Sequence, residues 1–121
     1  MDGTLYQRQY IRYPLGLEAR AVVGNNTNIR RCYVNTISHA GAAMNLLLRE
    51  ELLPGQNVML DIKYPDRVAP INMIVKLKWF EFLSGDDDFN AVAGGIITFI
   101  KEEDRKILLE YAYSQLLALN G

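Results

Sequence analysis

The 121-residue sequence has very few of the residues that most often carry catalytic or metal chemistry. Cys32 is its only cysteine, which excludes an internal disulfide framework and a cysteine-based metal cluster. His39 is its only histidine, and no residue is spaced to orient it, so neither a catalytic triad nor a metal site is visible. We therefore expect a protein that is not an enzyme and that holds no metal.

Long hydrophobic runs are also missing. No apolar run reaches the roughly 18 residues that would predict a membrane-spanning helix. The first fifteen residues lack the apolar segment of a signal peptide. Together with the single cysteine, these absences favour a reducing cytoplasm and argue against insertion into a membrane.

The net charge is small, but the basic residues are unevenly distributed along the chain. The formal net charge of -1 excludes nucleic-acid binding by bulk basicity, so we expect neither a DNA nor an RNA partner. Through residue 31, however, the chain has five arginines and no lysine. Arginine contacts phosphates bidentately and stacks on planar rings, which indicates a flat anionic ligand. Chance variation in so short a segment is the alternative explanation.

Turn residues divide most of the chain into short segments typical of strands. We predict six of them, at residues 15–23, 29–38, 41–48, 57–64, 71–83 and 91–100. In the fifth, Leu77 and Trp79 alternate with Lys76 and Lys78, which predicts that Trp79 lies in the core.

The final segment, residues 102–119, has helix formers and apolar residues at spacings of three and four. It is apolar on more than one side, so it either covers the end of a barrel or contributes a homodimer contact. Six antiparallel strands followed by one helix predict a mainly β protein: a single domain formed by a six-stranded antiparallel β-barrel with a C-terminal α-helix.

Two polar motifs flank the first predicted strand. Arg8 and Arg12 precede it, where an isolated arginine pair contributes little to stability. Thr36 and Ser38 end the second strand and would point to one face, while Gly41 allows a tight turn or a close approach to a ligand. Guanidinium, hydroxyl and backbone N–H groups can hold a phosphate or a base edge, so we predict that these five residues bind a ligand. Alternatively, the two arginines are ordinary solvent-exposed charges, the Thr36 and Ser38 hydroxyls bond across the sheet, and Gly41 only forms a turn.

In these motifs and their order, the sequence resembles the PilZ domain family, whose motifs are R-x-x-x-R and [D/N]-x-S-x-x-G. The matching segments are "RQYIR", "LEARAVV" and "TISHAG", followed by "LLPGQNVMLDI", "VKLKWFEF" and "GGIITFIKEEDRKILLEYAY". The resemblance runs from Gln7 to about Leu117. It implies a split-barrel fold with a flexible arm at residues 1–13, a barrel at 14–100 and a helix at 102–119.

The resemblance also implies a function. PilZ domains bind the bacterial second messenger cyclic di-GMP, so Arg8 and Arg12 would grip its phosphates or guanines, with Ser38 and Gly41 on the other side. The arm would become ordered over the ligand and transmit the signal to a protein effector. Cyclic di-GMP is the ligand implied, and no cofactor is expected.

Thr36 departs from the family pattern, which has Asp or Asn at this position. A hydroxyl pairs less well with a guanine edge, and losing such a contact costs about 1–3 kcal/mol. Asn35 would substitute only if a bulge shifted the register, because on a regular strand it faces the opposite side. The alternative function is therefore a degenerate PilZ domain that does not bind the nucleotide and acts as a protein–protein interaction module. A smaller departure concerns Gly95, which precedes Phe99 by four residues. The family usually has a glycine three residues before this phenylalanine.

Overall fold

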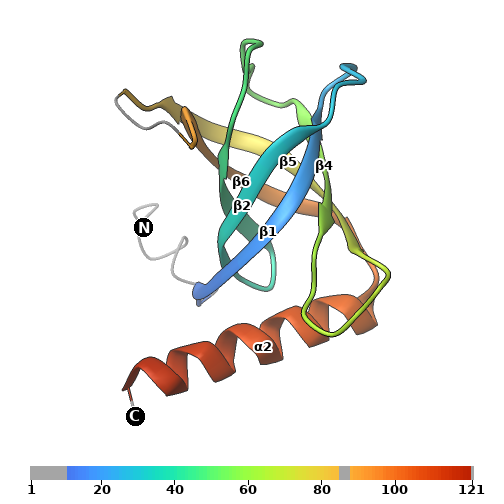
Figure 1. Ribbon diagram of the computed structural model, residues 1–121, viewed down its shortest axis with the longest axis vertical. Coiled ribbons are helices and arrows are strands. Elements are labelled where there is room, and N and C mark those ends of the chain that lie inside the picture. The colour runs from blue at the N-terminus through green and yellow to red at the C-terminus, as the bar shows by residue number, and fades with distance from the viewer. Residues whose placement is uncertain (1–10, 85–87, 121) are drawn as a thin grey trace, which may run out of the picture.

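The computed structural model describes residues 11–84 and 88–120 (Figure 1). Within these ranges the chain forms β1 (Tyr13–Val23), β2 (Arg30–Ile37), β3 (Gly41–Leu46), β4 (Asn57–Ile62), β5 (Ile71–Phe82), β6 (Ala91–Ile100) and α2 (Glu102–Asn120). The predicted strands and C-terminal helix are confirmed, and no end differs from its predicted position by more than two residues.

The strands close into a barrel in the order β1-β2-β3-β6-β5-β4. Every neighbouring pair is antiparallel, and β1 pairs with β2 on one side and with β4 on the other. Closure leaves none of these six strands with a free edge for pairing with other chains. The predicted six-stranded antiparallel β-barrel is thus confirmed.

The interior of the barrel is filled by alternate side chains of the strands. In β1, β4 and the first part of β5, every second side chain is buried, as their alternating apolar pattern predicts. The largest fully buried side chains are Ile37, Met44, Leu46, Leu60, Ile62, Ile71, Met73, Leu77 and Leu108. Cys32 is only 3% exposed, and burial raises the pKa of its thiol to about 12. It is a small core residue, as predicted, and not a reactive thiol.

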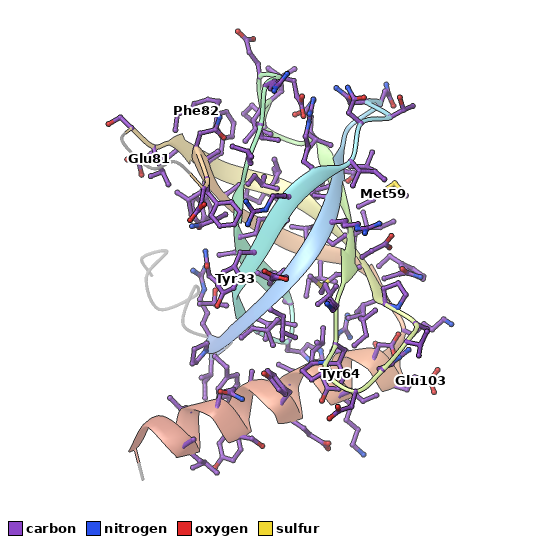
Figure 2. All side chains as sticks on the ribbon, viewed as in Figure 1. Tyr33, Met59, Tyr64, Glu81, Phe82 and Glu103 are labelled. Carbon is purple, nitrogen blue, oxygen red and sulfur yellow. The ribbon has the colours of Figure 1, made fainter. Side chains whose placement is uncertain are left out.

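Helix α2 runs across one end of the barrel (Figure 1). Its own side chains Leu108 and Ala112 are fully buried, and its Tyr111 ring meets the Tyr64 ring edge-on at 5.5 Å between centroids. Figure 2 shows Tyr64 on the β4–β5 loop, close to the helix. The apolar face of the helix therefore covers the barrel end. Of the residues described, no helix combines the length and apolarity needed to span a membrane.

The strand pairs contain four register shifts, and two of them affect predicted site or core residues. In β2, Asn35 is an extra residue between the pairs Val34–Met44 and Thr36–Ala43, so Asn35 and Thr36 both face outward. This corrects the expectation from a regular strand, in which Asn35 faces the opposite side from Thr36.

The second bulge lies in β5, between the pairs Leu77–Gly95 and Trp79–Gly94. Lys78 is the extra residue, so both Lys78 and Trp79 face outward. The prediction that Trp79 lies in the core is therefore wrong, and its side chain is 41% exposed. The prediction fails because the extra residue Lys78 interrupts the alternation of inward and outward side chains after Leu77.

Among the described glycines, Gly95 leaves the least room for a side chain. A Cβ atom there would lie 1.9 Å from the carbonyl oxygen of Lys76 on the neighbouring strand β5. Since that oxygen belongs to the backbone, it cannot move aside without displacing the strand.

We predict that Gly95→Ala lowers the free energy of unfolding by about 3 kcal/mol or more, because the methyl group separates β5 from β6. Urea denaturation followed by circular dichroism measures this loss. Thr98→Ala, an exposed change on the same strand, should cost no more than about 1 kcal/mol. Equal stability of Gly95→Ala and the parent would contradict the proposed strand contact.

Candidate functional site

A cavity of about 590 Å³ opens between the β2–β3 hairpin and strands β5 and β6. Its lining residues are Arg12, Thr36, Ser38, Gly41, Ala42, Ala43, Lys78, Trp79, Gly95 and Ile96. Four of the five predicted site residues thus share one cavity, whose volume is typical of a small-molecule site. The fifth, Arg8, lies outside the described residues.

Arg12 stands at the mouth of this cavity with its side chain exposed. It immediately precedes β1, and the pairing of Tyr13 with Ile37 puts it level with Ser38, which immediately follows β2. Within residues 11–84 and 88–120, no carboxylate forms an ion pair with its guanidinium group. This charge is therefore available to an anionic ligand.

Ser38 and Gly41 close the hairpin between β2 and β3. The Ser38 backbone N–H donates to the Gly41 carbonyl at 2.8 Å, and the Gly41 N–H donates to Ser38 Oγ at 3.0 Å. A Cβ atom on Gly41 would lie 2.7 Å from the Gly95 carbonyl oxygen, so only glycine fits here. The S-x-x-G motif consequently builds the hairpin and forms one wall of the cavity at the same time.

Thr36 is half-buried and lines the cavity at the position where the family has Asp or Asn. Asn35 shares its outer face but does not line the cavity. Its side-chain amide donates instead to Asn45 Oδ1 on β3 at 2.7 Å. Thr36 is therefore the residue of this pair that lines the cavity, while the Asn35 side-chain amide is hydrogen-bonded to Asn45.

Lys78, Trp79 and Ile96 form the opposite wall, which the sequence reasoning missed. The indole of Trp79 lies flat against β6, because a Cβ atom on Gly94 would come within 2.6 Å of its ring. A lysine charge beside a half-exposed indole suits a flat anionic ligand. Two adjacent signals, the pair of glycines at 94–95 and the consecutive bulky residues after Lys78, pointed to irregular strands here.

A second cavity, of about 610 Å³, lies over the outer face of β1, β2 and β4. Glu18 and Asp61 lie among its arginines, and Arg30 forms an ion pair with Glu50 at 2.6 Å. The hydrogen bond from Arg30 lowers the pKa of the Glu50 carboxyl group. Charges of both signs make this cavity less suited to a ligand with two phosphates than the cavity at Arg12.

No part of the described chain gathers three or more His, Cys, Asp or Glu side chains into a group able to hold a metal ion. The candidate site is therefore defined by its arginine, lysine, hydroxyl and aromatic groups.

Two solved structures share this fold. The inhibitor of motility (MotI/DgrA) of Bacillus subtilis superposes with a TM-score of 0.71 at 19% identity, covering 92% of this chain and 52% of that one. Our chain thus spans about half of the Bacillus protein. The PilZ domain of YcgR from Escherichia coli, solved with c-di-GMP, has a TM-score of 0.66 at 11% identity and covers 89% and 90% of the two chains. At these identities, the likeness concerns the fold.

The comparison with curated proteins gave no significant match. The family model of the PilZ domain, in contrast, matches residues 6–114, which include both sequence motifs. PilZ domains are nucleotide-binding receptor domains and not enzymes. Since the match extends over most of the sequence, and the barrel and its terminal helix agree with it, this chain belongs to the PilZ domain family.

Proposed function

We propose that this domain is a bacterial cytoplasmic receptor for cyclic di-GMP that passes its signal to a protein effector. The observation that carries the proposal is the cavity in which Arg12, Ser38 and Gly41 meet Lys78 and Trp79. The presence of c-di-GMP in the structure of the YcgR PilZ domain supports the choice of ligand.

The ligand offers two phosphates and two guanine bases to these groups. Arg12 grips a phosphate or the O6/N7 edge of a guanine bidentately, and Arg8 supplies the second clamp. Lys78 adds a point charge for a phosphate. Trp79 gives a flat apolar surface on which a guanine stacks.

Signal transmission follows from the position of the arginines. Arg12 immediately precedes β1, so a ligand bound to it and to Arg8 fixes the segment before Tyr13 against the mouth of the cavity. The bound nucleotide and the fixed segment together make a new surface. That change of surface is what an effector recognises.

The alternative function, an interaction module that no longer binds the nucleotide, is favoured by one pair of observations. Thr36 replaces the Asp or Asn of the family motif, and the neighbouring Asn35 amide is held by Asn45. No amide or carboxylate of this motif position is then free to pair with the guanine N1–H and N2–H₂ groups. Measured affinity decides between the two functions.

We predict that isothermal titration of the full chain with cyclic di-GMP gives saturable binding, with a Kd of roughly micromolar order. Arg12→Ala should weaken binding by about 10- to 100-fold, because a charge-assisted contact is lost. Thr36→Asp should strengthen it by about tenfold, since a carboxylate pairs with the guanine edge.

Arg20→Ala serves as the matched control, because Arg20 is an exposed arginine that lines the second cavity. Its affinity should equal that of the parent chain. Absence of binding by the parent, with binding gained only in Thr36→Asp, would establish the degenerate domain. Loss of binding in Arg20→Ala but not in Arg12→Ala would assign the ligand to the second cavity.

Trp79 is the only tryptophan, so intrinsic fluorescence reports directly on this cavity. We predict that cyclic di-GMP quenches the emission with the same Kd as calorimetry gives. Trp79→Phe should bind about tenfold more weakly through reduced stacking. If calorimetry detects binding while the emission stays constant, the base does not lie on Trp79.

A further inference from the structure

The side chains that line the cavity at Arg12 are rich in hydrogen-bond donors and poor in acceptors. Arg12 and Lys78 only donate hydrogen bonds, and the hydroxyl groups of Thr36 and Ser38 both donate and accept. Among the lining residues that the structure describes, none is Asp, Glu, Asn or Gln. This part of the wall therefore offers no carboxylate or side-chain amide oxygen to a bound base.

The hydroxyl group of Ser38 is already satisfied within the β2–β3 hairpin. It accepts a hydrogen bond from the Gly41 N–H at 3.0 Å and donates one to the Gly41 carbonyl oxygen at 3.4 Å. Ser38 is only 6% exposed, so this hydroxyl keeps its partners whichever base is bound. Of the two described lining hydroxyls, that of Thr36 is then the one open to a base edge.

The charged groups of the cavity, Arg12 and Lys78, have exposed side chains. An exposed donor that meets no acceptor on the base is hydrated instead, so it discriminates only weakly between bases. Among the described residues, the one buried side-chain nitrogen or oxygen without a partner is Arg105 Nε on α2, outside this cavity. A base that lacks a polar group therefore leaves no buried side-chain group of the described lining unpaired.

Guanine and adenine share their flat ring and their N7 acceptor but differ in the polar groups along their edges. A site rejects such an analogue strongly only when it buries a partner for the missing group. Reading the N1–H and N2–H₂ donors of guanine requires an acceptor such as a carboxylate. A hydroxyl, in contrast, accepts from the N1–H of guanine and donates to the N1 of adenine, so Thr36 suits both bases.

We propose that this site accepts cyclic purine dinucleotides without strong discrimination between guanine and adenine, so that cyclic di-AMP and the mixed guanine–adenine dinucleotide are ligands beside cyclic di-GMP. The inference rests on the proposed receptor function and defines its ligand class. Arg12 and Lys78 hold the phosphates, which all three nucleotides share. Trp79 stacks on the flat ring of any purine.

Titration calorimetry of the full chain with the three dinucleotides tests the inference. We expect their Kd values to agree within about tenfold, because neither base leaves a buried group unpaired. A Kd for cyclic di-AMP at least about 100-fold weaker than that for cyclic di-GMP would overturn the inference and leave the receptor function standing. A chain that binds none of the three would overturn the receptor function as well.

AMP and GMP control for unspecific attraction of anions. Each has one base and one phosphate, so each should bind at least about tenfold more weakly than the dinucleotides. An affinity for AMP equal to that for cyclic di-AMP would overturn the proposal. Arg12→Ala should weaken the binding of all three dinucleotides by the same factor, because they share the phosphates. A loss confined to cyclic di-GMP would show that Arg12 reads the guanine edge and would likewise overturn it.

Substitution of Thr36 tests the origin of the weak discrimination. Thr36→Asp presents a group that only accepts, so cyclic di-GMP should bind about tenfold more tightly and cyclic di-AMP about tenfold more weakly. Thr27→Asp is the matched control, since Thr27 is exposed in the β1–β2 loop and the change adds the same charge. Its two Kd values should keep the ratio of the parent chain.

Thr36→Val keeps the shape of the side chain and removes the hydroxyl group. It should weaken cyclic di-GMP and cyclic di-AMP by the same factor, because the hydroxyl serves both bases. Circular dichroism confirms that each variant is folded. A loss restricted to cyclic di-GMP in Thr36→Val, or an unchanged ratio of the two Kd values in folded Thr36→Asp, would overturn the assignment of weak discrimination to Thr36.

Discussion

Closure of the barrel is the constraint on which the other features of this domain depend. Six strands close on themselves only if β1 pairs with both β2 and β4, which demands strong curvature in a small sheet. Gly95 has no room for a side chain against the carbonyl oxygen of Lys76, and its own carbonyl oxygen leaves no room for a side chain on Gly41. Side chains at either glycine would separate β6 from its neighbours. The same contacts therefore hold the barrel closed and fix the wall of the cavity.

The candidate site uses the irregularities that accompany this curvature. Each bulge adds one residue to a strand and turns two successive side chains outward, so Thr36 and Trp79 both face the cavity side of the sheet. Gly94 then leaves room for the indole to lie against the backbone of β6. Ser38 fixes the hairpin through the Gly41 N–H and lines the cavity as well. The groups that would meet a ligand are thus held by backbone geometry rather than by a network of side chains.

The sequence by itself determined the number and the limits of the strands and the terminal helix. It also grouped Arg12, Thr36, Ser38 and Gly41, which line one cavity in the structure. These features follow from apolar periodicity, turn residues and motif spacing, all of which are local along the chain. Only the tertiary structure decided that Trp79 faces outward and that the Asn35 side-chain amide is bound to Asn45. Bulges and register arise from the pairing of strands distant in sequence, so a local pattern such as the glycine pair at 94–95 can indicate an irregular strand but does not place the bulge.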